Sequence, residues 1–567
     1  MKKLLAIILA VITLLSSSVP AFAATSGMEK KVVRLTTEDL AENPALAIEN
    51  LLKETKDNRK LDLTIVVPEG RYVLTQPLHI YNNTKLVFEG DTFLIRKFNV
   101  GCMLKCGTEN DVSIGYNGYQ NITVIGGIWD NKFTERTGIM RFAHCKNVLL
   151  KNMTIKNDRN SHHMEIAGVY NFTLDNVTFS GYQRTINSSG ETVQIDPLHH
   201  PEHFKAYQLL DDTPSKNITV KNCTFKNVFS GVGSRAGVAG SYFSNIKIIN
   251  NKFYNIKDKA ICTFNYVNSE ISGNVINGAS VGIFVEEFPT VHYSSKFYMP
   301  YDKRRSEIKI RTDIKLKITG NKITVNRNAG YAQSCGIGVY GGVMSGSSYY
   351  KNGAYIVNNI KISKNRITLK HPAAYGIDLQ YVNKSTVSDN IINEKSSAYS
   401  YVSGISFYHG KKNKVFRNRV NGKLQFGIKL KDHSSMSKFY SNRISGVKQC
   451  GLAIYSGSKL YVGTSNNYCG TAAISDKVFK KPIMKCKLKY TRKKKLTVIE
   501  WDKCNNASGY YVYRKTSKNG KYKLIKTIRD KGKTKFSEKT KNRCYYHIVP
   551  YKTYKNSTLV GRRVTKK

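Results

Sequence analysis

The chain has 567 residues, with 90 Lys and Arg against 39 Asp and Glu, which gives a net charge of +51. A hydrophobic share of 41% excludes a wholly disordered chain, and the 42 glycines without a three-residue period exclude a collagen-like one. The length indicates several units or a solenoid, and the excess positive charge indicates an anionic partner.

Residues 1–23 have the pattern of a secretory signal peptide. Lys2 and Lys3 precede an apolar run at 4–15, and Ala21-Phe22-Ala23 forms a small-x-small cleavage site. The run is too short to span a bilayer. We therefore expect a secreted or wall-associated chain without a membrane span, for which nucleic acid is not a partner.

Asparagine-containing repeats organise residues 61–475. Segments such as NFTLDNVTF (171–179) and NIKISKNRI (359–367) alternate apolar and polar residues, and a second short strand precedes each one. Strands of this length, in units of about 24 residues, predict the stacked coils of a β-solenoid. Asparagine at the turns tolerates left-handed backbone and bonds to the next coil, which predicts an Asn ladder.

The ladder positions are Asn251, Asn274, Asn321, Asn365, Asn390, Asn418 and Asn442. Their spacings are 23, 47, 44, 25, 28 and 24 residues. The two large values are about twice the repeat, so we expect one further coil inside each of those gaps.

These repeats resemble the right-handed parallel β-helix of the pectate-lyase-like superfamily. The sequence IVVPEGRYVL (65–74) looks like the first coil of that superfamily, and ALAIENLLKE (45–54) reads as an amphipathic helix that caps it. The resemblance implies an all-β solenoid over 61–475, preceded by an N-terminal segment at 24–60. Residues 286–315 break the repeat and predict a protruding loop that carries Lys303, Arg304 and Arg305.

A second unit follows at 483–567, where 27 Lys and Arg face 4 Asp and Glu. Alternating runs such as GYYVY (509–513) and YYHIV (545–549) predict a small β-sandwich. With Trp501 on an early strand, it resembles a fibronectin type III-like module. Its charge suggests a tether to anionic cell-wall polymers.

Eleven scattered cysteines lack any Cys-x-x-Cys pair. Several fall at apolar positions of the repeat, so we interpret them as buried free thiols.

Histidines and carboxylates gather in one part of the solenoid, because six of the 12 histidines lie within 144–203. Aligning the strands RFAH, MEIA and VQID places Arg141, Glu165 and Gln194 in one outward column, with Asp196 on the same face. Neighbouring coils are about 4.8 Å apart, so Glu165 and Asp196 are the predicted carboxylate pair of a glycoside hydrolase. The further candidates for catalysis are His162, His163 and Glu191.

A groove along the same face is expected to bind the polymer. The candidate binding residues are Arg141, His144, Arg184, Gln194, Arg235, Glu286, Tyr340, Asp378 and Gln380. The arginines suit a uronate, sulfate or phosphate group, and residues 197–213 are expected to wall one end of the cleft. In HHPEH (199–203) Pro201 argues against a helical zinc site.

Three functions stay open from the sequence. The leading one is hydrolysis of an anionic polysaccharide, and the second is a lyase with His162 or His163 as base and Arg184 or Arg235 as neutraliser. The third is a non-catalytic surface protein that binds polyanions or cell-wall polymers. The aspartate cluster of calcium-dependent pectate lyases and the motifs of polygalacturonases are both missing, so only the fold transfers. No cofactor or metal is expected, Ca²⁺ lacks support, and a capped solenoid suits a monomer.

Overall fold

The computed structural model describes residues 27–135, 138–186, 190–199, 207, 209–234, 236–286, 297–298, 311–327, 334–341, 356–396, 402–448, 450–455, 458–462, 467–468, 472–474, 488–504, 507–554, 557–560 and 564–565. The predicted signal peptide, Arg235 and the basic run at 303–305 lie outside these ranges.

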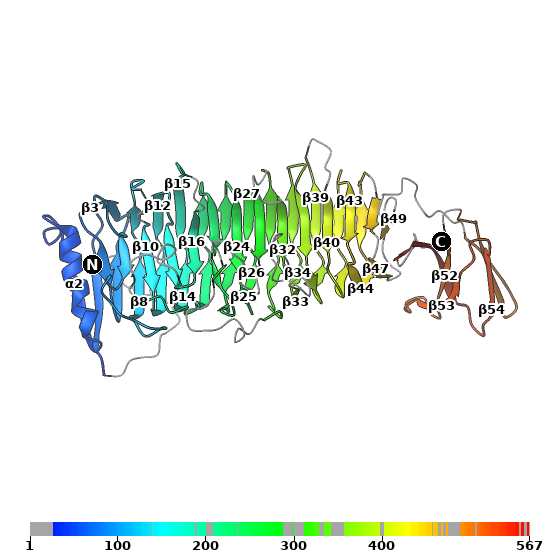
Figure 1. Cartoon of the computed structure of the whole chain (residues 1–567), viewed down its shortest axis with the longest axis horizontal. Helices are drawn as coiled ribbons and strands as arrows, with labels where there is room; N and C mark the ends of the chain where they lie inside the picture. The colour runs from blue at the N-terminus through cyan, green and yellow to red at the C-terminus, as the bar shows by residue number, and fades with distance from the viewer. Residues whose placement is uncertain are drawn as a thin grey trace, which may run out of the picture.

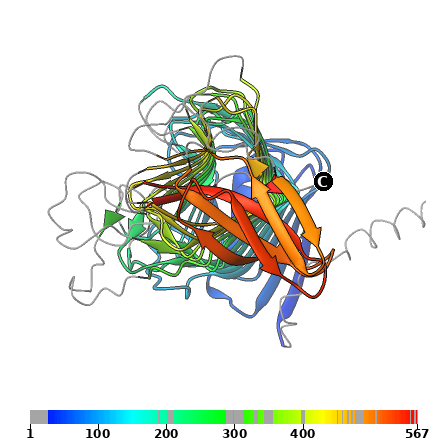
Figure 2. The same ribbon diagram turned by 90° about the vertical axis from the view of Figure 1, so that its right-hand side faces the viewer.

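A right-handed parallel β-helix forms the long body of the protein (Figure 1). Each coil contributes to three parallel sheets, and the coils superpose when viewed along the axis (Figure 2). Sheet A begins with β1 (Glu29–Arg34) and β2 (Leu61–Val67), and sheet B runs from β3 (Arg71–Leu74) to β48 (Asn467–Tyr468). The all-β solenoid expected from the repeats is therefore confirmed.

Sheet C carries the predicted site and has one strand from each of 14 coils. Its strands are β4 (Leu78–Ile80), β7 (Leu104–Cys106), β10 (Met140–Ala143), β13 (Met164–Ala167), β16 (Glu191–Asp196), β19 (Ser230–Gly233), β24 (Lys259–Phe264), β28 (Val281–Glu286), β32 (Cys335–Tyr340), β36 (Tyr375–Gln380), β40 (Ser403–Tyr408), β43 (Phe426–Lys431), β46 (Cys450–Ile454) and β49 (Ala472–Ile474).

The later part of sheet A has shorter strands. They are β22 (Lys247–Ile249), β26 (Glu270–Ser272), β30 (Lys317–Thr319), β34 (Lys361–Ser363), β38 (Thr386–Ser388), β41 (Asn413–Phe416), β44 (Ser435–Tyr440) and β47 (Lys459–Val462).

Helix α2 (Pro44–Asp57) covers the N-terminal end of the solenoid (Figure 1). Pro44 suits the first helical turn, and the Asn43 side chain caps the helix by accepting a hydrogen bond from Leu46 N at 3.1 Å. Ala45, Ile48 and Leu52 are fully buried on one face. The helix thus shields the apolar interior of the first coils from water.

Like residues stack in register through the interior. In sheet B, Phe179, Phe225 and Phe253 lie on successive coils with ring centroids 5.0 and 4.7 Å apart. In sheet A, Ile248, Ile271, Ile318 and Ile362 form an equivalent column. The repeat in the sequence therefore becomes a continuous apolar core, which no coil could bury alone.

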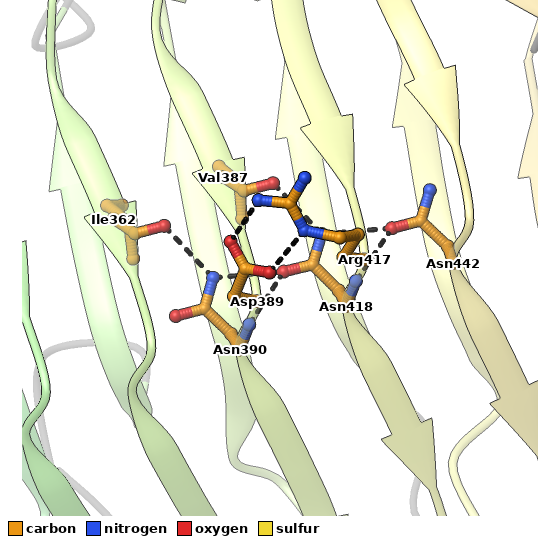
Figure 3. Close-up of polar contacts among 7 residues, drawn as sticks. All are labelled: Ile362, Val387, Asp389, Asn390, Arg417, Asn418 and Asn442. Carbon is orange, nitrogen blue, oxygen red and sulfur yellow. Dashed lines mark hydrogen bonds and ion pairs between the residues drawn. The ribbon is translucent and has the colours of Figure 1, made fainter.

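The predicted Asn ladder is present and buried (Figure 3). Asn390 Nδ2 donates to Asn418 Oδ1 and to the Ile362 carbonyl, both at 3.0 Å, and Asn418 Nδ2 donates to Asn442 Oδ1 at 3.0 Å. The left-handed backbone, however, belongs to the residue before each ladder asparagine, such as Asp389 with φ 60°. The ladder side chains instead satisfy backbone groups that the turn leaves unpaired.

The expectation of an extra coil in each long gap is wrong. Strand β26 pairs directly with β30, and β30 with β34, while Asn274 Nδ2 donates to Asn321 Oδ1 at 2.9 Å. The added residues are insertions between strands of consecutive coils. A spacing near twice the repeat does not distinguish an added coil from an insertion of similar length.

The C-terminal unit is a small sandwich beyond the last coil (Figure 1). One sheet has β50 (Leu488–Lys493), β51 (Leu496–Trp501) and β54 (Lys535–Lys539). The other has β53 (Lys523–Ile528), β52 (Gly509–Lys515), β55 (Tyr545–Tyr554), β56 (Ser557–Val560) and β57 (Val564–Thr565). Its core holds Trp501, Tyr510, Val512 and Ile548.

Among the described residues, seven cysteines are buried free thiols, as predicted, namely Cys102, Cys106, Cys145, Cys223, Cys262, Cys335 and Cys544. Cys504 in the C-terminal unit departs from that expectation because it is disulfide-bonded.

Candidate functional site

The strand register brings the predicted site residues together on the outer face of sheet C. In the register of β10, β13 and β16, Arg141 lies opposite Glu165, and Glu165 lies opposite Gln194. Asp196 lies beside Ala167, two positions farther along the same face. Glu165 and Asp196 are therefore diagonal neighbours, with Cα atoms roughly 8 Å apart from the strand and coil spacings.

Arg141 and Glu165 form a buried ion pair. Arg141 Nε donates to Glu165 Oε2 at 2.5 Å, and its NH2 group contacts the same oxygen. Only 5% of Glu165 is exposed. Because a buried carboxylate needs a partner, the contact with Arg141 stabilises Glu165 within the protein.

Asp196 is fully buried and held by its neighbours. Its Oδ2 accepts a hydrogen bond from Gln194 Nε2 at 2.7 Å, and its Oδ1 accepts one from Ala236 N at 3.3 Å. Gln194 Oε1 is buried without a hydrogen-bond partner. Both members of the predicted carboxylate pair are thus bound inside the protein, while an unsatisfied acceptor lies beside them.

Glu191 and His162 lie next to this pair. His162 Nδ1 donates to the Glu191 carbonyl at 2.6 Å and lies 3.9 Å from Glu191 Oε2. That carboxylate oxygen is buried and has no hydrogen-bond partner. A buried, unsatisfied carboxylate oxygen beside an imidazole indicates a place where water or a ligand hydroxyl fits.

The other two histidines serve the fold. His163 is fully buried, its Nε2 faces the carbonyls of Ser180 and Gly181 at 3.2 and 3.1 Å, and burial lowers its pKa to about 4. His144 connects two loops, since its Nδ1 lies 2.9 Å from the Gly115 carbonyl and its Nε2 lies 3.1 Å from the Leu209 carbonyl.

Asp158, on β12 (Thr154–Arg159) of sheet B, was missed by the sequence analysis. Its side chain is fully buried, its Oδ2 accepts from Ser161 N at 3.1 Å, and its Oδ1 has no hydrogen-bond partner. Burial raises its pKa to about 7, and the Glu165 charge adds to that shift. A lone aspartate at the end of a repeat strand gives no sequence signal, because only folding brings it to Glu165.

The segment expected to wall the cleft lies against sheet C in its described part. Tyr207 and Leu210 pack on Ala143, Ala167 and Leu198. His199 Nδ1 lies 2.5 Å from Asp212 Oδ1, which holds that histidine within the loop. The outward face at β10 and β13 is therefore covered there.

The remaining candidates lie apart from this cluster. The Arg184 guanidinium sits over the Phe229 ring at 4.4 Å, and Arg235 lies outside the described residues. Glu286, Tyr340 and Gln380 occupy one column on β28, β32 and β36. Tyr340 Oη and Gln380 Nε2 donate to Asp378 Oδ2 at 2.8 and 3.0 Å, and burial raises the pKa of Asp378.

Within the described ranges, His, Cys, Asp and Glu side chains form no group of three that suits a metal ion. In the same ranges, no helix has the length and apolar character to cross a membrane.

Comparison with known proteins supports the fold. Residues 306–468 match the family model of the right-handed beta helix region. Plasmin and fibronectin-binding protein A of Streptococcus pneumoniae is 24% identical over 245 residues, which cover 37% of this chain and 34% of that protein. The match thus spans about a third of the curated relative.

Two solved structures of the S. pneumoniae surface adhesin PfbA also superpose on the chain. One has a TM-score of 0.51 at 16% identity, covering 87% of this chain and 98% of the other. The second has a TM-score of 0.49 at 18% identity, covering 78% and 99%. At these identities the likeness concerns the fold alone.

Proposed function

We propose that this chain is a secreted or surface-attached protein that binds polysaccharide along the outer face of sheet C. The observation that carries the proposal is a row of residues on five successive coils, β32 to β46. The row consists of Tyr340, Gln380, Tyr408 and Lys431 in strand register, followed by Tyr455 directly after β46, where its N–H bonds to the Leu430 carbonyl at 2.9 Å.

This row suits a sugar polymer for two reasons. The three tyrosines are half-buried, so each presents part of a ring while its base is fixed by packing. Lys431 Nζ lies 5.1 Å above the Tyr408 ring, and Gln380 adds an amide for hydroxyl groups. Because the coils repeat, equivalent groups recur along the axis, as the units of a polymer do.

Binding to a panel of neutral and anionic polysaccharides tests this proposal. Tyr408→Ala should weaken binding about tenfold, since loss of an aromatic contact is worth roughly 1–1.5 kcal/mol. Tyr254→Ala removes an exposed tyrosine from sheet B and is the matched control. Equal affinities for Tyr408→Ala and the native chain would contradict the proposal.

Glycoside hydrolysis is the second candidate, and the pair Asp158 and Glu165 favours it. Burial raises the pKa of Asp158 to about 7, while Glu165 is held in an ion pair with Arg141, and hydrolysis needs two carboxyl groups in such different surroundings. Glu191 offers a further unsatisfied oxygen. Their burial means that the covering segment must move before a polymer reaches them.

Reducing ends and absorbance near ~235 nm, followed together on the same panel, separate the enzymatic alternatives. Reducing ends without absorbance, lost in Glu165→Gln, Asp196→Asn and Asp158→Asn, would support hydrolysis. Rising absorbance would support the lyase. No product, combined with tight binding, leaves the binding protein as the function.

We also propose that the C-terminal unit is a fibronectin type III-like tether for anionic wall polymers. Support comes from its three-stranded sheet facing a larger antiparallel sheet and from its net charge of +23, with 27 Lys and Arg against 4 Asp and Glu. The surface location of the streptococcal adhesin agrees with this role. Binding to purified walls should fall steeply with added salt and with removal of teichoic acid.

A further inference from the structure

The outer face of sheet A contains a basic hollow of about 560 Å³, which spans β34, β38 and β41. Five cationic side chains line it, namely Lys361, Lys364, Lys384, Lys414 and Arg417, together with one carboxylate, Asp389. All five cations are exposed. The hollow lies on a different sheet from the polysaccharide-binding row proposed above.

Small side chains between long ones create the hollow. In one column, Lys361 and Lys414 stand on either side of Thr386, and in the adjacent column Ser363 neighbours Ser388. Short hydroxyl side chains thus form the floor, and lysines form the rim. Such a concave floor with a charged rim brings a bound group within reach of several ammonium groups at once.

The lysines are available because the protein does not neutralise them. Among the described residues, Lys361, Lys364, Lys384 and Lys414 take part in no ion pair. The carboxylate in the hollow is already occupied, since Arg417 Nε and NH2 bind Asp389 Oδ1 and Oδ2 at 2.5 and 2.9 Å (Figure 3). Lys361, Lys384 and Lys414 therefore lack an ion-pair partner among the described residues, while Lys364 is close enough to Asp389 to help lower the pKa of that carboxyl.

The cationic row extends beyond the hollow along the solenoid. The register aligns Lys247, Glu270, Lys317, Lys361, Thr386, Lys414 and Lys438 in one column. Neighbouring coils are about 4.8 Å apart, so the lysines repel one another unless anions lie between them. A linear anion that runs along the axis meets a cation every one or two coils, about 5–10 Å.

From this geometry we infer that the hollow on sheet A is a binding site for a linear polymer that carries sulfate or phosphate groups. Tetrahedral oxyanions accept hydrogen bonds from several lysines and hydroxyls at once, which suits the rim and floor. The polymer lies across the strands, along the solenoid axis, and the hollow receives one of its anionic groups.

The test uses the full mature chain with two probes, a sulfated hexasaccharide and inorganic polyphosphate of defined length. The triple variant Lys361→Gln, Lys384→Gln, Lys414→Gln should lose at least about tenfold in affinity for the preferred probe. Lys252→Gln, Lys322→Gln, Arg366→Gln removes three exposed cations from sheet B and is the matched control. It should lose less than about twofold.

Lysine acetylation with and without each probe locates the binding independently of the C-terminal unit. Lys361, Lys384 and Lys414 should be protected, whereas Lys252 and Lys322 should react as in the free protein. Equal losses in both triple variants, or protection confined to residues 488–565, would overturn the inference and assign binding to net charge or to the C-terminal unit. The relative protection by the two probes decides between sulfate and phosphate.

Substitution of the carboxylate in the hollow should change the affinity for the anionic probe in the opposite direction from the lysine substitutions. Asp389→Asn removes the negative charge from the hollow and releases Arg417, so affinity should rise a few-fold. A fall in affinity would count against the site. The lysine triple variant and Asp389→Asn both leave the row at Tyr408 unchanged, so binding of a neutral polysaccharide to sheet C should stay the same. Failure of the anion site on sheet A can therefore be distinguished from failure of the polysaccharide-binding row.

Discussion

The outer face of sheet C at β10 to β16 and the hollow of sheet A at β34 to β41 hold charged side chains in opposite ways. On sheet C, Arg141 and Glu165 are buried and bound to each other, and Tyr207 and Leu210 pack nearby. On sheet A, Lys361 and Lys414 are exposed and have no ion-pair partner among the described residues. Outward-facing charged side chains therefore stabilise the fold where another segment covers them, and they are accessible to a ligand where no described segment does.

The largest loss of stability should come from breaking the buried ion pair between Arg141 and Glu165. Arg141→Met leaves Glu165 buried without its partner, which should lower the free energy of unfolding by about 3–5 kcal/mol. Urea unfolding at neutral pH measures the loss. Adding Glu165→Gln to Arg141→Met removes the uncompensated carboxylate and should recover part of the lost free energy, and a double variant no more stable than Arg141→Met would contradict the proposed cause.

Asp158 should give the covered region a pH dependence. Its pKa is about 7 in the folded protein against 3.8 ordinarily, so the folded state holds its proton more tightly. The resulting stabilisation is complete below about pH 3.8 and is lost as the pH rises through 7. Relative to Asp158→Asn, the native chain should lose about 3–4 kcal/mol between pH 4 and 8, measured by urea unfolding at each pH. Parallel curves for the two proteins would refute the shift.

A substitution in the Asn ladder should give the next largest loss of stability. Asn390→Ala removes the acceptor for Asn365 N and Nδ2 and the donor to the Ile362 carbonyl, so a cost of about 2–3 kcal/mol is expected. Asn277→Ala, at an exposed asparagine of sheet B without left-handed backbone, is the control and should cost less than about 1 kcal/mol. Similar melting temperatures for both variants would show that burial of the ladder is unimportant.

The ion pair between Arg417 and Asp389 in the open hollow should contribute least to the free energy of unfolding. Arg417→Met removes the bidentate contact with Asp389, yet the Arg417 side chain is 53% exposed and that of Asp389 is 28% exposed, so we expect a change below about 1 kcal/mol. The substitution matches Arg141→Met in chemistry and differs in burial. Comparable losses for the two variants would remove the distinction between the covered and open regions.

The sequence alone determined the periodic part of this protein. Alternating apolar residues determined which side chains enter the coil, and the recurring asparagine predicted the ladder. The column that contains Arg141, Glu165 and Gln194 was therefore predicted correctly. The reason is local: a parallel strand with a set register admits one inward and one outward set of residues.

Tertiary structure decided whatever depends on segments that leave the coils. The insertions in the two long gaps had lengths close to that of a coil, so the spacing alone suggested extra coils. Folding brought the Asp158 carboxyl close enough to Glu165 for the two charges to interact. The loop that carries Tyr207 packs on sheet C. The hollow on sheet A likewise depends on which short side chains become neighbours across three coils. The burial of outward-facing side chains such as Glu165, and with it their accessibility, arises from contacts with segments distant in sequence, which no periodic pattern encodes.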